Sequence, residues 1–317
     1  MYKIGHNKEI KRNGPVKNPG RFFLLCFSIF AQMLFSSCRV ETNSQTNLVS
    51  NSQQALKIIT LQNQMAPDFY AYILDKIKNN QPMGNLTKTW GVAIPHHQLA
   101  ADVMAQTLFQ LKDNDYENII ILSPDHFNRG TTQISFVESQ LKTATGITQI
   151  SKQDIDTLKT LDKTANGDGF IAFEHGVGTP IPFIVSLWPK ANITPILVRG
   201  DAKKSDLTEL LHFLETKSRQ PKTLIIESSD FSHYLTPEAA HQKDLQTIEI
   251  LKQDDPEKIL NLHQPDNCDS INILYIMKKL QISEKARLDV YLNKNSQDYT
   301  KEKVTSSTSY LSFFISE

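Results

Sequence analysis

Three apolar segments of the sequence each lead into a histidine, namely His96, His126 and His233. In open α/β sheets, ligands bind beyond the carboxyl ends of the strands, so we expect these side chains to face a common crevice. Pro95 and Pro124 support this expectation, because a proline directly after a strand ends the ladder and leaves the next side chains free. One such histidine would be an ordinary surface residue, but three on one sheet predict a shared site.

The residue types at these strand ends suit a transition metal. Imidazole and carboxylate ligands together bind first-row metals, and two histidines with one anionic ligand are typical of non-haem iron sites with open positions. Asp230 and His233 lie three residues apart in a strand-exit turn. They could orient a metal ligand or move a proton, as a supporting carboxylate and a general base do.

Cys268 is the only cysteine after residue 38, so no disulfide can form within the expected domain. A lone thiol is either buried and inert or has a chemical task. Cys268 directly precedes Asp269 and Ser270, either of which could begin a helix. A thiolate at a helix N-terminus would have a lowered pKa, and as a ligand it would admit copper(I) or zinc beside iron.

A further motif, Glu174-His175-Gly176, adds His175 as a fourth histidine candidate for the cleft. Gly176 and Gly178 of this segment suggest a close backbone approach to a ligand or to a neighbouring strand. The alternative interpretation is a glycine-rich turn whose Glu174 and His175 are solvated. Both interpretations stay open at this point.

Runs rich in isoleucine and valine alternate with helical patterns along the chain. This alternation predicts an α/β fold with a mixed, mostly parallel sheet and helices on both faces. The two last apolar segments alternate with period two and predict an antiparallel pair near the C-terminus. Strands are expected at residues 89–94, 118–122, 132–137, 193–198, 223–226, 286–292 and 309–315, and helices at 69–78, 99–111, 155–161, 207–214, 237–252 and 270–280.

The N-terminal part has the pattern of a targeting segment. Basic residues precede an apolar run that ends in Ser36-Ser37-Cys38, which resembles the processing site of bacterial lipoproteins. We therefore expect a signal peptide or membrane anchor at 1–37, a flexible tether at 38–54 and an α/β domain at 55–317. Lipidation of Cys38 would make the protein exported and membrane-tethered, while an uncleaved anchor or simple secretion are the alternatives.

Composition excludes some classes of partner. The chain has 317 residues, with 34 Lys and Arg against 34 Asp and Glu, so no bulk positive field exists to attract nucleic acid. We expect a small molecule or a peptide as ligand, and a membrane only through the N-terminus. The domain is about as large as one hydrophobic core allows.

The order and spacing of these motifs resemble the Memo family, known in prokaryotes as AmmeMemoRadiSam system protein B. The most specific part is the segment from Ser228 to His233. That family is similar in fold to class III extradiol ring-cleavage dioxygenases, whose site holds Fe(II) with two histidines and a glutamate. The resemblance implies His96, His126 and Cys268 as metal ligands, with Asp230 and His233 lining the same cleft.

The chain departs from the family pattern in two places. His97-Gln98 follows His96 where the family usually has Ala-Gly, and Gly176-Val177-Gly178 follows His175 where it usually has a serine, an aliphatic residue and a glutamate. The proposed metal ligands are unaffected by these departures.

The leading hypothesis is a metal-binding protein that is redox-active or dioxygenase-like on an unidentified small substrate. Iron(II) or copper would bind at His96, His126 and Cys268, with zinc possible, while His233, Asp230 and His175 would act in catalysis. One alternative is a non-catalytic module that binds a peptide or metal ions at the membrane surface. A zinc hydrolase is another, since three N or S ligands with a water form a catalytic zinc arrangement.

Overall fold

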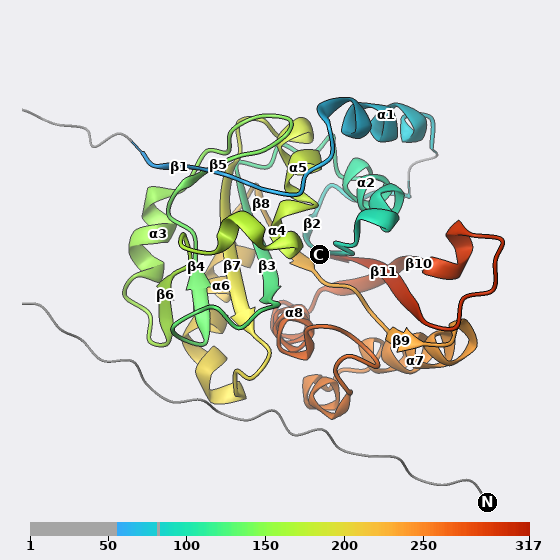
Figure 1. Ribbon diagram of the computed structural model, residues 1–317. Coiled ribbons are helices and arrows are strands. Elements are labelled where there is room, and N and C mark those ends of the chain that lie inside the picture. Colours follow the sequence, from blue (N-terminus) through green and yellow to red (C-terminus); the bar gives the residue numbers. More distant parts are fainter. Residues whose placement is uncertain (1–55, 81–82) are drawn as a thin grey trace, which may run out of the picture. The chain divides into compact units, whose positions relative to one another are not determined.

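A nine-stranded mixed sheet forms the centre of the domain in the computed structural model, which describes residues 56–80 and 83–317 (Figure 1). Along the sheet the order is β10-β11-β2-β8-β3-β7-β4-β6, and β9 pairs with β11. A separate two-stranded sheet pairs β1 with β5. The strands are β1 Ile58–Thr60, β2 Thr89–Ile94, β3 Asn118–Asp125, β4 Ile134–Phe136, β5 Gln140–Lys142, β6 Thr164–Asn166, β7 Asn192–Arg199, β8 Thr223–Ser228, β9 His233–Leu235, β10 Arg287–Asn295 and β11 Ser307–Ser316.

The middle of the sheet is parallel, and antiparallel pairs lie on both sides of it, while the outermost pair β4 and β6 is again parallel. β2, β8, β3 and β7 pair in parallel, whereas β10 with β11, β11 with β2, and β4 with β7 are antiparallel. The expected mostly parallel sheet with an antiparallel C-terminal pair is therefore confirmed. In Figure 1 the red strands β10 and β11 lie at one end of the sheet and β4 and β6 at the other.

Helices cover both faces of the sheet. The α-helices are α1 Pro67–Ile77, α2 Ala101–Phe109, α3 Lys152–Leu158, α4 His175–Gly178, α5 Ile181–Leu187, α6 Thr208–Ser218, α7 Pro237–Leu251 and α8 Ile271–Ser283. Short 3-10 helices are η1 Gln98–Ala100, η2 Ile171–Phe173, η3 Lys204–Leu207, η4 Pro256–Asn261 and η5 Ser296–Tyr299. One apolar core packs α1, α2 and α5 on the sheet, and a second packs α3, α6 and α8.

The central strand β3 contributes side chains to both apolar cores. Ile119 and Ile121 belong to the core with α2 and α5, while Ile120 and Leu122 belong to the core with α6 and α8. Side chains alternate between the faces of a strand, so a continuous apolar run is what a strand covered on both faces requires. Each of these four side chains is fully buried. Burial of one such side chain stabilises the fold by about 1.5–3 kcal/mol relative to leaving it exposed.

Helix starts explain two of the local expectations. α7 begins at Pro237 after Thr236, whose side chain accepts a hydrogen bond from the Ala239 backbone N–H, as expected. α8 begins at Ile271 with Ser270 as its N-cap residue. Asp269 therefore precedes the cap, and its carboxylate is free to project elsewhere.

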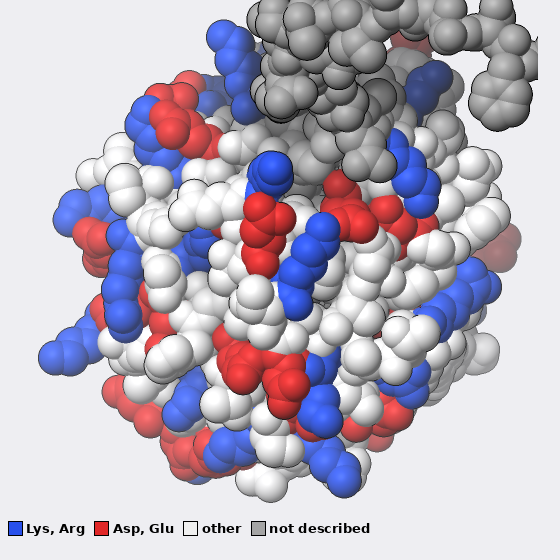
Figure 2. Space-filling model, turned by 90° about the vertical axis from the view of Figure 1, so that its left-hand side faces the viewer, with Lys and Arg blue, Asp and Glu red and all other residues white. Residues whose placement is uncertain are grey.

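The expectations for residues 1–37, 38–54 and Cys38 lie outside the described residues. Within the described residues, no helix is both long enough and apolar enough to cross a membrane. On the face of the molecule that Figure 2 draws, positive and negative side chains are interspersed rather than gathered by sign.

Candidate metal centre

Neighbouring parallel strands bring the polar residues of the sequence motifs together. β2, β8 and β3 are adjacent in the sheet, and the loops that leave their carboxyl ends carry His96, Asp230 and His126. A cleft of about 480 Å³ opens at this edge. Its lining includes His96, His126, His175, Asp230, His233 and Asp269.

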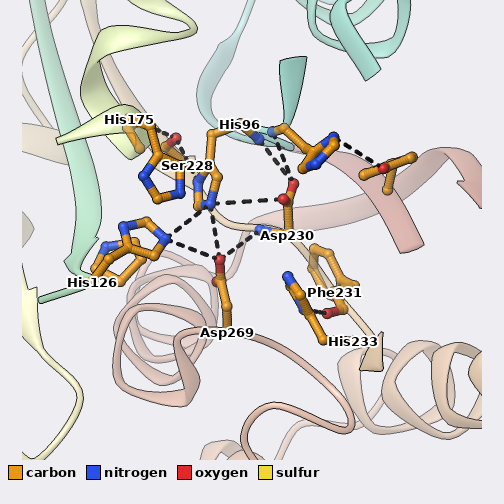
Figure 3. A network of polar contacts seen from close by, with 12 residues as sticks. His96, His126, His175, Ser228, Asp230, Phe231, His233 and Asp269 are labelled. Atoms are coloured by element: carbon orange, nitrogen blue, oxygen red, sulfur yellow. Dashed lines mark hydrogen bonds and ion pairs between the residues drawn. The ribbon is translucent and has the colours of Figure 1, made fainter. Parts of the chain in front are cut away.

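The tightest part of the cleft joins two imidazoles and one carboxylate (Figure 3). The Nε2 atoms of His96 and His126 are 3.2 Å apart. Asp269 Oδ2 lies 3.0 Å from His96 Nε2 and 3.6 Å from His126 Nε2. His175 and Asp230 flank this group, each close enough to be part of a metal-binding set with His96.

These separations fit a metal ion. Ligand atoms about 2.1 Å from a first-row metal are about 3.0 Å apart at right angles and about 3.4 Å apart at tetrahedral angles. The three contacts between His96, His126 and Asp269 span 3.0 to 3.6 Å, as a set of adjacent ligands would. Asp269 Oδ1 is also buried without a hydrogen-bond partner among the described residues. A His/Asp group that could hold a metal ion is thus present.

Glu174 fixes the ring of His126. Its Oε1 lies 2.5 Å from His126 Nδ1, and its Oε2 accepts from the His126 backbone N–H at 3.2 Å. A carboxylate can only accept here, so Nδ1 carries the proton and Nε2 is the nitrogen available to a metal. Glu174 is almost completely buried, at 2% exposure, and it also accepts from the Gly176 N–H.

Ser228 fixes the ring of His96 in the same sense. Ser228 Oγ donates its only proton to the Gly176 carbonyl at 2.5 Å. It must therefore accept in its 3.3 Å contact with His96 Nδ1, which leaves Nε2 directed into the cleft. Gly176 packs so tightly here that a β-carbon would clash with Ser123 and lie 3.1 Å from His126 Cε1. The close backbone approach expected for the two glycines is thus present at Gly176, whereas a β-carbon at Gly178 would meet nothing within 4 Å.

The cluster is electrostatically coupled through its carboxylates. Burial lowers the pKa of His126, but hydrogen bonds with Asp269 and Glu174 outweigh it and raise the pKa to about 10. The pKa of His96 is also raised, because Asp230 and Asp269 outweigh the effect of its burial. Burial acts to raise the pKa of Asp269, yet the two imidazoles hold it well below its usual range. The site therefore attracts positive charge strongly.

The three residues expected to act in catalysis all line the cleft. The His175 ring lies over His126, with ring centroids 3.9 Å apart and planes tilted by 34°. Burial together with the cationic His96 and His126 lowers the pKa of His175 to about 4. Asp230 Oδ1 accepts from the backbone N–H groups of His96 and His97 at 3.0 and 3.3 Å. His233 Nδ1 lies 2.5 Å from the Phe231 carbonyl oxygen (Figure 3).

Cys268 is placed differently from the expectation. Its thiol is fully buried outside the imidazole–carboxylate group, with Sγ accepting from the Ser270 N–H at 3.4 Å. Burial and the neighbouring Asp269 raise its pKa well above the usual range, so the expected lowering of the pKa is wrong. Asp269, one residue later, faces His96 and His126 instead.

Sequence reasoning missed Glu174 as the orienting partner of His126, Ser228 as that of His96, and Asp269 as a possible ligand. Glu174 had a usable signal, since it lies beside a histidine and near two glycines in a segment that could be buried. Asp269 was interpreted as a helix cap, and the choice between Asp269 and Ser270 for that role cannot be made from propensity, because both are good N-cap residues.

The fold and the site define a mixed α/β protein with a polar, metal-compatible cleft at the carboxyl edge of its sheet. The Memo-like protein family model matches residues 64–314, and the chain belongs to this family. The expected family assignment is therefore confirmed.

Individual relatives are distant in sequence. A MEMO1 family protein of Methanococcus maripaludis (strain C5) is 26% identical over 249 residues, which are 74% of this chain and 87% of that protein. One from Nitrosopumilus maritimus is 25% identical over 192 residues, 59% of this chain and 67% of that protein. One from Thermotoga sp. (strain RQ2) is 25% identical over 142 residues, and there the match spans only half of the relative's length.

Replacing Glu174 tests its role in holding His126. Glu174→Gln should weaken metal binding by about 10–100-fold, because partners that orient a ligand typically change affinity by that factor. The measurement is competition with a chromophoric chelator at constant pH. Glu249→Gln on the surface of α7 is the matched control and should bind metal as the wild type does. Equal affinity in both variants would contradict the orienting role.

The raised pKa of His126 predicts a pH dependence of stability in protein stripped of metal by a chelator. Protonated His126 stabilises the fold below its ordinary pKa of about 6.5, and this contribution is lost as the pH rises through about 10. The free energy of unfolding in urea should therefore fall more for the wild type than for His126→Gln between pH 6.5 and 10. Parallel pH profiles for the two proteins would argue against the charged contacts described.

Proposed function

We propose that this protein binds Fe(II) through His96, His126 and Asp269 and uses it in redox chemistry on a small organic substrate held in the cleft. The observation that carries the proposal is the close approach of two Nε2 atoms and one carboxylate oxygen at separations typical of adjacent metal ligands. Two histidines and one carboxylate with open positions form the ligand set of non-haem Fe(II) oxygenases.

The carboxylate changes which metal we favour. With a thiolate ligand at Cys268, copper(I) or zinc would have been as suitable as iron. Asp269 is a harder ligand, which supports iron(II) over copper(I). Class III extradiol dioxygenases hold Fe(II) with two histidines and a glutamate, and we propose that this chain has the same kind of ligand set, with Asp269 in place of the Cys268 that the family resemblance implies.

The bound iron would supply electron transfer between dioxygen and a reduced substrate at its open positions. The remaining chemistry falls to side chains of this chain. His175 lies against the His126 ring and lines the cleft, where a neutral imidazole could accept a proton from the substrate. Asp230 holds the backbone of His96 and His97 in place, and His233 offers Nε2 to the cleft.

Two adjacent residues allow a sharp test of the ligand set. Asp269→Ala should lower iron affinity by more than about 100-fold, since even partners outside the ligand set change affinity by about 10–100-fold. Cys268 is the preceding residue and its side chain is fully buried. Cys268→Ala should leave the iron content unchanged. Metal content would be measured by mass spectrometry after anaerobic reconstitution. Loss of iron in the cysteine variant but not in the aspartate variant would contradict the proposed ligand set.

A second candidate function has its own observation. His96, His126 and His175 form a group of three imidazoles that could hold a metal ion, and three histidines with a water are a catalytic zinc arrangement. In that case His175→Ala, not Asp269→Ala, would abolish metal binding, and zinc would support hydrolysis where iron does not. Iron uptake without any redox turnover would instead favour a non-catalytic module that binds a peptide or metal ions.

We also propose that the protein is exported and tethered to a membrane through a lipid on Cys38. The support is the basic and apolar pattern before Ser36-Ser37-Cys38, and the family match begins only at residue 64. Cys38→Ser should move the protein from the membrane fraction to the soluble fraction, while Cys26→Ser should leave it with the membrane. Immunoblots of the two fractions distinguish these outcomes, and membrane retention of Cys38→Ser would favour the uncleaved apolar anchor over a lipid.

A further inference from the structure

His97, directly after the proposed ligand His96, is held in one orientation at the wall of the cleft. Its ring stacks on Tyr310 of β11, with centroids 5.7 Å apart and planes inclined by 27°. Tyr310 is fully buried, and its hydroxyl lies 3.2 Å from His97 Nδ1. His97 itself is exposed and lines the same cleft as the metal cluster. Tyr310 therefore fixes the position of the His97 ring on the protein side, while the side that faces the cleft is open to a ligand.

Hydrogen bonding determines which ring nitrogen of His97 carries the proton. His97 is the N-cap residue of η1, and its Nδ1 accepts from the Leu99 backbone N–H at 3.3 Å. A backbone N–H can only donate, so Nδ1 is an acceptor and Nε2 carries the hydrogen. The Tyr310 hydroxyl then donates to the same Nδ1. His97 thus presents a fixed Nε2–H donor, for which no protein partner exists among the described residues.

His233 presents the opposite character. Its Nδ1 lies 2.5 Å from the Phe231 carbonyl oxygen, which can only accept, so Nδ1 carries a hydrogen. In the neutral ring Nε2 is then an acceptor. His233 lines the same cleft as His97. The backbone on the His97 side is tied to the metal cluster, because Asp230 accepts from the N–H groups of both His96 and His97.

We propose that His97 and His233 form a ligand-positioning subsite beside the metal centre. It takes a substrate that carries a hydrogen-bond acceptor for His97 Nε2–H and a hydroxyl or amine donor for His233 Nε2, in addition to the group that faces His96 and His126. The inference rests on the proposed function in one respect, that the ligand of the metal centre occupies this cleft. Its substrate class is a small polar organic molecule that carries both a hydrogen-bond acceptor and a hydroxyl or amine donor.

The first test separates the donor of His97 from its structural role. In His97→Asn the shorter side chain can still cap η1 by accepting from Leu99, but it offers no donor at the position of Nε2. With 4-nitrocatechol as the probe and absorbance as the signal, affinity for the anaerobic iron-loaded protein should fall about 3–10-fold, as expected for one lost hydrogen bond. His97→Gln, with a longer side chain that keeps an N–H donor, should recover part of the affinity.

The controls keep the two proposals distinguishable. His212→Asn, on the exposed face of α6, should leave probe affinity unchanged, and all three variants should take up iron as the wild type does. Normal iron uptake with equal probe affinity in wild type and His97→Asn, or with no probe binding in the wild type, would overturn the subsite alone. Absence of iron uptake in the wild type would instead contradict the proposed function.

A spectroscopic measurement decides the subsite even without metal. Long-range ¹H–¹⁵N correlation spectra of histidine-labelled protein, assigned by comparison with His97→Asn, report which ring nitrogen is protonated. We expect the Nε2–H form for His97, and Tyr310→Phe should shift the His97 Nδ1 resonance because that nitrogen loses a donor. A His97 ring with its hydrogen on Nδ1, or one averaging between both forms, would overturn the inference.

Discussion

The parallel pairing of β2 and β3 on either side of β8 is the constraint on which the site depends. Gly91 of β2 pairs with Ile225 of β8, and Ile120 of β3 pairs with the same residue from the other side. One strand therefore sets the register of both neighbours. Because a shift by one residue turns every side chain to the opposite face, the two apolar cores hold this register firmly. The positions of His96 and His126 at the sheet edge follow from it.

Polar contacts then convert this approximate placement into a defined geometry. Ser228 at the end of β8 links His96 to the Gly176 carbonyl, and Glu174 links His126 to the Gly176 N–H. The short segment around Gly176 thus connects the two imidazoles, although Gly176 is 52 residues from Ser228 along the chain. These contacts are buried, so each would be costly to leave unmade. The rings are held before any ligand arrives.

Much of the fold and part of the site could be predicted from the sequence. The apolar runs at β3 and β8 and the alternation at β10 and β11 are strong signals, since burial on one or both faces dictates them. His96, His126 and Asp230 were found because they directly follow such strands. The short strands β1, β5, β6 and β9 had no comparable signal, as three-residue strands show little periodicity.

What the sequence did not reveal depends on contacts between distant segments. Glu174 is 48 residues from His126, and its orienting role follows only from the packing of α4 against the end of β3. His97 acquires its fixed ring from Tyr310, which is 213 residues away. Local patterns carry no information about such pairings. The sequence could assign histidines and carboxylates to the cleft. It could not identify the residues that hold their side chains in place.

The start of α8 has a broader consequence for the chemistry of this family member. Cys268 and Asp269 are consecutive in the segment before the cap at Ser270, and only one of them faces the two imidazoles. The point at which this helix begins therefore acts as a selector between a soft sulfur donor and a hard oxygen donor. If the cluster binds a metal as proposed, the turn before Ser270 decides which kind of donor atom that metal meets.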